Sequence, residues 1–218
     1  MSMTPQTPTP DKDPIPGQQC VYVVDDDEAM RDSMVWLIES EGLPVHPFAS
    51  AEAFLAAYQD GLAGCLVLDV RMPGMSGLEL YERLAAQRST LPVIFITGHG
   101  DVPMAVSALK KGAADFIEKP FNDTDMLRLI RQCLTLDQER RARRAREDSV
   151  SQRLAQLTAR EREVMDRVVE GKLNKQIADE LNISMKTVEA HRARVMDKMG
   201  VRSLAELVQC ALEGERGG

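Results

Sequence analysis

Three short apolar runs in the first half of the chain each end at charged residues. VYVV precedes Asp25 and Asp26, CLVL precedes Asp69, and DFIE precedes Lys119. Apolar runs of this length, bounded by turn residues and separated by helical patterns, are typical of buried parallel strands. Parallel strands end at a common edge of their sheet, where open α/β sheets bind their ligands. We therefore expect the three carboxylates and the ammonium group to converge in one crevice.

Carboxylates held this close together repel one another unless a cation joins them. A hard divalent ion with oxygen ligands is the simplest such cation, and Mg2+ is the one we expect here. Asp27 and Glu28 continue the acidic run, but they stand where a helix begins. Negative charge is favourable at that end of a helix, so we interpret both as helix-start residues.

Five apolar runs alternate with five helical patterns in the first 136 residues. The expected strands are 21–24, 44–48, 65–68, 93–96 and 114–117. Ser50 is positioned to cap the second helix, and Ser76 with Glu79 forms a capping box at the start of the third. Five βα units in one domain's length predict an α/β fold with a doubly wound, five-stranded parallel sheet.

The charge balance separates the front of the chain from the back. Residues 1–137 contain 10 Lys and Arg against 20 Asp and Glu, whereas residues 138–218 contain 17 against 14. An acidic front half joined to a mildly basic back half suggests a sensor module followed by a nucleic-acid module.

The back half carries the helix signals of a second, all-α domain with four helices. Thr158 with Glu161 and Ser203 with Glu206 are capping boxes, and Asn174 and Ser184 are positioned as caps of two further helices. Two helices joined by a short turn and braced on either side predict a helix-turn-helix, whose second helix enters the major groove of DNA.

The stretch from Val21 to Phe121 resembles the receiver domain of two-component response regulators. VVDDDE, LDVRMPGMSGLEL, FITGHGD and GAADFIEKPF match its signature blocks in order and spacing. The resemblance implies that Asp69 is the phosphoacceptor nucleophile. It implies that Asp25, Asp26, Asp69 and the backbone carbonyl of Arg71 bind Mg2+.

The resemblance also assigns roles to three further side chains. Lys119 would pair with the product phosphoryl group, Thr97 would donate its hydroxyl to it, and Phe116 would be the aromatic switch that follows Thr97. The Lys119-Pro120 pair resembles the family's cis-proline turn. His99 is expected to be a loop residue, because the hard cation prefers oxygen ligands.

Residues 157–208, from LTAREREVMDRVV to SLAELV, resemble the LuxR-type helix-turn-helix of the NarL/FixJ response regulators. Both domains look closest to the FixJ branch. Arg192 and Glu189 are the expected base contacts, because Arg pairs with guanine and Glu accepts from cytosine. The other expected DNA contacts, mostly to phosphates, are Lys175, Lys186, Thr187, His191, Arg194 and Lys198. The spacing of His191 from Val188 and Val195 also allows a position partly toward the core.

The expected organisation is a disordered tail over 1–18, a receiver domain over 19–136, a linker over 137–155 and the DNA-binding domain over 156–218. The linker has almost no apolar face after Leu136, which predicts a solvated helix or a flexible tether. The tail lacks the basic and apolar regions of a signal peptide, and no stretch is long enough to span a membrane. Cys20, Cys65, Cys133 and Cys210 are expected to be buried, reduced thiols of a cytoplasmic protein.

The resemblance implies a transcription regulator rather than an enzyme, with Mg-dependent self-phosphorylation and autodephosphorylation chemistry. A histidine kinase would phosphorylate Asp69, and the homodimer that forms would bind double-stranded promoter DNA, contact RNA polymerase and regulate transcription. Activation is the expected direction, with repression left open. A dehalogenase-like phosphatase is an alternative, but it needs a second Asp where this chain has Arg71. A receiver that binds DNA constitutively is another, and the set of Asp69, Thr97 and Lys119 argues against it.

Overall fold

The computed structural model describes residues 18–98 and 102–216, and these form two compact units that divide between Arg140 and Arg141. The disordered tail expected over 1–18 lies outside the described residues apart from residue 18, and His99, expected to be a loop residue, lies outside them too.

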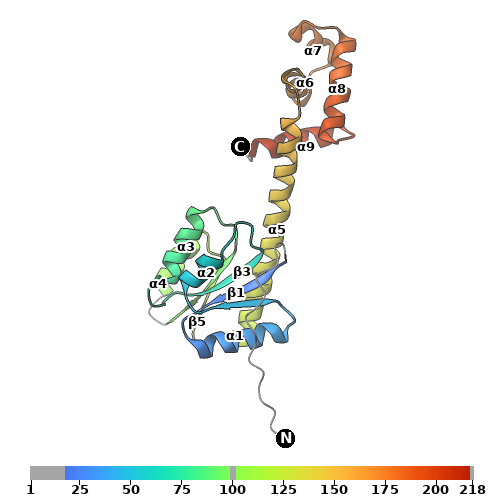
Figure 1. The fold of residues 1–218 in the computed structure, drawn as a ribbon. Helices are drawn as coiled ribbons and strands as arrows, with labels where there is room; N and C mark the ends of the chain where they lie inside the picture. The colour runs from blue at the N-terminus through green and yellow to red at the C-terminus, as the bar shows by residue number, and fades with distance from the viewer. Residues whose placement is uncertain (1–17, 99–101, 217–218) are drawn as a thin grey trace. The chain divides into compact units, whose positions relative to one another are not determined.

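The first unit is built on a sheet of five parallel strands (Figure 1). The strand order is β2-β1-β3-β4-β5, so the direction of winding reverses between β1 and β3. A crevice opens at such a reversal, beyond the carboxyl ends of the strands. In chain order the elements are β1 Cys20–Val24, α1 Glu28–Ser40, β2 Val45–Phe48, α2 Ala51–Ala57, β3 Gly64–Asp69, α3 Gly77–Ala86, β4 Val93–Thr97, α4 Val102–Lys110, β5 Asp115–Glu118 and α5 Asp123–Ala155.

Helices cover both faces of this sheet, because the strands alternate apolar side chains between two cores. Tyr22 and Phe95 belong to the core beneath α2, α3 and α4, whereas Val23 and Ile94 belong to the core beneath α1 and α5. The two groups of helices lie on opposite faces in Figure 1. The α/β prediction is therefore confirmed.

The sequence signals for helix starts agree with the structure in the first unit. Asp27 accepts from the backbone N–H of Ala29 at 2.9 Å, as expected for a residue at the start of α1. Ser50 caps α2, and Ser76 and Glu79 form the complete capping box of α3.

Helix α5 is 33 residues long and includes the whole stretch 137–155 that was expected to be a linker. The expectation of a solvated stretch after Leu136 is wrong at Asp137, which is 0% exposed. Its Oδ2 accepts from the backbone N–H of Gly64 at 2.9 Å and from Nε2 of Gln19 at 3.2 Å. Asp137 thus ties α5 to the amino-terminal ends of β1 and β3.

The second unit contains the carboxyl-terminal part of α5 followed by α6 Ala159–Val169, α7 Asn174–Leu181, α8 Met185–Met199 and α9 Leu204–Arg216. Thr158 and Glu161 form the capping box of α6, and Ser184 caps α8. The prediction that Asn174 caps α7 is wrong, because Leu173 is the N-cap and Asn174 is already helical. The Asn174 side chain is therefore free to accept a hydrogen bond from Arg192.

The second unit has a core of its own, formed by Val164, Ile177, Val188 and Val195 with neighbouring apolar residues. None of the helices within residues 18–98 and 102–216 is long and apolar enough to cross a membrane. All four cysteines are free thiols, and Cys210 is half-buried rather than buried as expected.

Candidate functional site

Three carboxylates meet at the carboxyl edge of β1 and β3, beside the reversal of the sheet. Oxygens of Asp25, Asp26 and Asp69 all lie within 4.8 Å of one another. Asp25 is 0% exposed and Asp69 is 8% exposed, whereas Asp26 is exposed. The three carboxylates therefore converge as the apolar runs predicted, and their oxygens could bind a divalent cation.

Lys119, in the segment after β5, neutralises part of this charge. Its Nζ lies 2.5 Å from Oδ2 of Asp69 and 3.1 Å from Oδ2 of Asp25. Burial raises the pKa of the Asp25 carboxyl, and the hydrogen bonds from Asp27 N–H and Lys119 oppose that rise. Burial also lowers the pKa of the Lys119 ammonium, but its hydrogen bonds to Asp69 and Asp25 outweigh burial and raise the pKa overall. Lys119 is therefore a permanent cation at neutral pH.

The chemistry of the pocket fits a hard cation and a phosphoryl group. The donors in the acidic group are carboxylates, which Mg2+ prefers, and one lysine cannot balance three negative charges. Thr97 is fully buried at the end of β4, and its Oγ1 has no hydrogen-bond partner within the described parts of the chain. A buried hydroxyl of this kind is suited to donate to an oxygen that enters the pocket.

The remaining residues expected at this site lie around its rim. The backbone N–H of Arg71 donates to Oδ1 of Asp69 at 2.8 Å, which places the Arg71 peptide next to the pocket while its side chain is exposed. Phe116 is half-buried on β5 and packs against the core beneath α4. The Lys119-Pro120 peptide bond is cis, as the resemblance implied.

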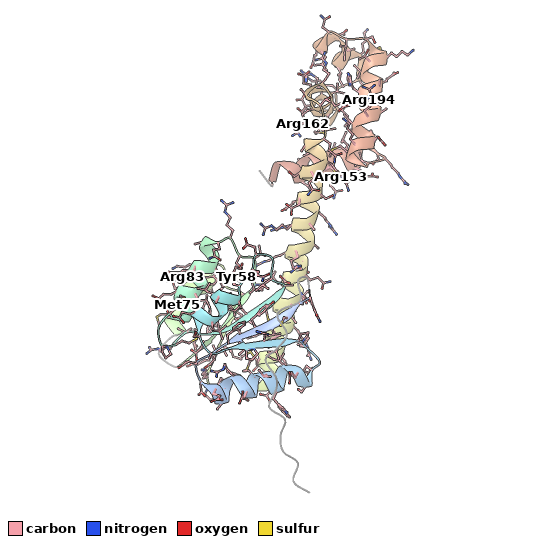
Figure 2. All side chains as sticks on the ribbon, in the orientation of Figure 1. Tyr58, Met75, Arg83, Arg153, Arg162 and Arg194 are labelled. Carbon is pink, nitrogen blue, oxygen red and sulfur yellow. The ribbon has the colours of Figure 1, made fainter. Side chains whose placement is uncertain are left out.

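Two residues that sequence patterns did not single out hold the backbone of this site. Nη1 of Arg31, on α1, donates to the backbone carbonyl of Asp25 at 2.7 Å. Oε1 of Glu52, on α2, accepts from the backbone N–H of Met75 at 2.9 Å. Figure 2 labels Met75, which precedes α3. Both helical positions are polar and outside the apolar stripes, so periodicity alone does not distinguish them from solvated residues.

In the second unit, α7 and α8 form the expected helix-turn-helix, with α6 and α9 packed against them. Val188, Val195 and Met199 are the buried residues of α8. Lys186, Glu189 and Arg194 are exposed, and Figure 2 labels Arg194 on this helix. Lys175 is exposed on α7. These four side chains are free to meet nucleic acid.

Arg192, the other expected base contact on α8, is less exposed than Glu189. It is half-buried, and its Nη1 donates to Oδ1 of Asn174 at 2.7 Å, joining the two helices of the motif. The spacing from Val188 by four residues and from Val195 by three was the signal for this inward position.

Three further expected DNA contacts, Lys198, Thr187 and His191, are half-buried in the second unit. Nζ of Lys198 lies 2.6 Å from Oε2 of Glu161 and 3.1 Å from the carbonyl of Gln156. Oγ1 of Thr187 lies 2.8 Å from Oγ of Ser184. His191 is half-buried, and within the described residues its buried Nδ1 has no hydrogen-bond partner. Lys198 therefore contacts Glu161 of the α6 capping box.

Comparison with known proteins identifies both units. Residues 21–131 match the model of the response regulator receiver domain, and residues 155–211 match the model of bacterial regulatory proteins of the luxR family. Transcriptional regulatory protein FixJ of Bradyrhizobium diazoefficiens is 46% identical over 192 residues, which cover 88% of this chain and 94% of the relative. The C4-dicarboxylate transport transcriptional regulatory protein DctR of Rhodobacter capsulatus is 47% identical over 191 residues, or 87% of this chain and 97% of the relative.

Solved structures agree with these matches. The response regulator StyR has a TM-score of 0.83 and 45% identity, and the match covers 90% of this chain and 100% of StyR. Full-length FixJ from B. japonicum has a TM-score of 0.55 and 44% identity, with 91% and 98% covered.

The two matched domains together make a transcriptional response regulator. The chain belongs to the response regulators in which a receiver domain precedes a LuxR-type DNA-binding domain, the family that includes FixJ. The dehalogenase-like phosphatase alternative is thereby excluded.

Proposed function

We propose that Asp69 accepts a phosphoryl group from a phosphohistidine of a cognate histidine kinase. The observation that carries this proposal is the position of the Asp69 carboxylate, at the end of β3 in the acidic group and 2.5 Å from the Lys119 ammonium. A carboxylate oxygen of Asp69 forms a bond to phosphorus while the P–N bond breaks, and the imidazole leaves with the electron pair. The product is an aspartyl phosphate.

The side chains around Asp69 supply the positioning and charge that this transfer needs. Asp25, Asp26, Asp69 and the carbonyl of Arg71 would hold Mg2+, which when bound offsets charge on the phosphoryl oxygens. Lys119 presents a permanent positive charge to the new phosphoryl group, and Thr97 donates its hydroxyl to one of the phosphoryl oxygens. The same groups would support self-phosphorylation by small donors and the later hydrolysis of the acyl phosphate.

Replacing Asp69 by asparagine tests this assignment, because the amide is nearly the same size but is a poor nucleophile. We expect the wild-type chain to gain a phosphoryl mass after treatment with acetyl phosphate and Mg2+, and Asp69→Asn to gain none. Mass spectrometry of the intact chain measures both. A phosphoryl mass that persists on the variant would place the nucleophile elsewhere.

For the second domain, we propose that α8 enters the major groove of promoter DNA with its exposed face. Glu189 and Lys186 are the side chains on that face that reach base edges, while Lys175 and Arg194 contact phosphates. Arg192 is reassigned from a base contact to a link between α7 and α8, because Asn174 already binds its guanidinium group. Promoter DNA as the target places the protein in the cytoplasm.

We propose that phosphorylation converts the chain to a homodimer that binds promoter DNA and activates transcription through RNA polymerase. Met104 and Val106 on α4 are 39% and 38% exposed, which gives the receiver domain apolar surface next to the Thr97 strand. Sedimentation with and without the phosphoryl mimic beryllofluoride tests dimerisation, which we expect only with the mimic. An unchanged mass, together with equal DNA affinity in both states, would favour constitutive DNA binding.

A further inference from the structure

The loop between β3 and α3 carries the peptide of Arg71 and is held at both ends. Near its start, the backbone N–H of Arg71 donates to Oδ1 of Asp69 at 2.8 Å. At its end, the backbone N–H of Gly77 donates to the carbonyl of Val70 at 3.1 Å. Between these two bonds, Met72 and Met75 are buried in the core beneath α2, α3 and α4, and the backbone of the segment is fixed by the contacts it makes along its length.

Glu52 contacts this segment near its middle from a different helix. Its Oε1 accepts from the backbone N–H of Met75 at 2.9 Å, although the two residues are 23 positions apart. Oγ of Ser50 caps α2 by accepting from the N–H of Ala53 at 3.1 Å, so the cap does not require the bond between Glu52 and Met75. The Glu52 contact is therefore directed at the loop.

Gly74 shows how closely the loop passes over this carboxylate. A Cβ atom on Gly74 would lie only 2.9 Å from Oε1 of Glu52, and the φ angle of Gly74 is +75°. Glycine adopts this backbone conformation without strain and leaves room for the carboxylate. Gly74 thus leaves space for the Glu52 carboxylate, and Met75 donates a hydrogen bond to it.

The hydrogen bond between Glu52 and Met75 is charge-assisted. The backbone N–H of Glu52 itself, followed by that of Met75, lowers the pKa of the Glu52 carboxyl. The group is therefore an anion at neutral pH, and an ionised acceptor makes shorter and stronger hydrogen bonds than a neutral one.

We propose that Glu52 is a positioning residue for the phosphoacceptor loop, which holds the backbone between Arg71 and Met75 so that the Arg71 carbonyl faces the Asp25, Asp26 and Asp69 carboxylates. The inference rests on the proposed function, because it presumes that this carbonyl and these carboxylates bind Mg2+. Mg2+ requires near-ideal ligand geometry, so a loop backbone that lacks the Glu52 contact and is less well fixed at Arg71 would bind it more weakly. Groups that orient metal ligands typically change metal affinity by about 10-fold to 100-fold.

The test compares Glu52→Ala and Glu52→Gln with Glu82→Ala as the matched control. Glu82 is an exposed glutamate on α3 whose carboxylate pairs with Lys111 at 2.7 Å. Isothermal titration calorimetry of the full, unphosphorylated chain with MgCl2 gives the dissociation constant without any reaction. We expect Glu52→Ala to bind Mg2+ about 10-fold more weakly. Glu52→Gln should recover part of the loss, because its amide oxygen still accepts from Met75, and Glu82→Ala should match wild type.

Phosphorylation by acetyl phosphate across a range of Mg2+ concentrations gives a second measurement. Glu52→Ala should need more Mg2+ for half-maximal rate and approach the wild-type rate at saturation, because Asp69 itself is unchanged. Thermal denaturation without Mg2+ shows whether the variants are folded. If wild type binds Mg2+ and Glu52→Ala binds it as tightly as Glu82→Ala, the positioning role of Glu52 is wrong while the proposed function stands. Failure of wild type to bind Mg2+ would overturn the proposed function together with this inference.

Discussion

Gly77, the first residue of α3, is packed directly against Asp69, the proposed phosphoacceptor. A Cβ atom at this position would lie 2.1 Å from the backbone oxygen of Asp69 and 3.0 Å from Cγ of Leu68. Ordinary contacts begin at 3.4 Å, so in Gly77→Ala the helix start and the Asp69 carbonyl must separate by about 1.3 Å (3.4 less 2.1). Gly77 does not have a left-handed φ angle, so crowding alone is the expected cost.

This displacement acts on Asp69, which we propose takes the phosphoryl group. A misplacement of about 1 Å at a reacting centre costs on the order of 100-fold in rate. Overpacking of a buried site costs about 1 to 3 kcal/mol of stability. We therefore expect Gly77→Ala to remain folded at 25 °C but to be phosphorylated by acetyl phosphate roughly 100-fold more slowly than wild type.

Initial rates from mass spectrometry of the intact chain, with thermal denaturation followed by circular dichroism, measure both effects. Gly42→Ala is the control, because Gly42 has φ +70° and no heavy atom within 4 Å of an added Cβ. Gly42→Ala should lose about 1 kcal/mol of stability through backbone strain and keep the wild-type rate of phosphorylation. A wild-type rate and melting temperature for Gly77→Ala would refute the reasoning, because the loop would then absorb the methyl group without moving Asp69.

Three further predictions concern the DNA-binding domain. The Lys198 ammonium, followed by the backbone N–H of Thr158, lowers the pKa of the Glu161 carboxyl from 4.5 to about 2. The contribution of Glu161 to stability is therefore complete above about pH 4.5 and is lost as the pH falls toward 2. In Glu161→Gln, the free energy of unfolding should depend less on pH over this acidic range, which a series of denaturation experiments at different pH values measures. Glu189→Ala should relax the preference at one base position and cost about 1 to 3 kcal/mol of binding free energy on the preferred site. Arg192→Ala should weaken binding to all sites alike, and binding to a randomised-site library distinguishes the two variants. Lys175→Ala should lower the slope of the logarithm of DNA affinity against the logarithm of salt concentration by about one. Lys198→Ala should leave that slope unchanged and lower the melting temperature. Equal slopes for both variants would contradict the assignment of Lys175 to a phosphate.

The sequence predicts the phosphoacceptor pocket because its geometry follows from strand direction alone. Asp25, Asp69 and Lys119 each come at or just after the end of an apolar run, and parallel strands bring such positions to one edge whatever their separation in the chain. Helix starts are predicted for a similar reason, because the cap of Ser76 and Glu79 depends on residues only three positions apart.

Long-range polar contacts were not predicted, because neither periodicity nor local spacing reports them. Asp137 stands in a polar stretch of α5, yet its carboxylate is buried against the N–H of Gly64, 73 residues away. Glu52 is an exposed residue of an Ala-rich helix, and only the fold brings it to Met75. A pattern along one element shows which face is apolar, but it does not show which polar side chain on the other face meets a distant backbone group.

Helical phase determines which side chains of α8 are free for base contacts, and here the sequence did contain the signal. At 3.6 residues per turn, Arg192 falls about 40° from Val188, within the buried stripe, whereas Glu189 falls about 100° away and Ala193 about 140° away. Ala190 and Ala193 are exposed beside Glu189. Small side chains allow the helix to approach the base edges closely, and alanine can contact the methyl group of thymine. Direct base preference should therefore depend mainly on Glu189 and Lys186 with the two neighbouring alanines. Cytosine opposite Glu189 and thymine opposite an alanine should be the favoured bases, and Arg192 contributes by holding α8 against Asn174 of α7.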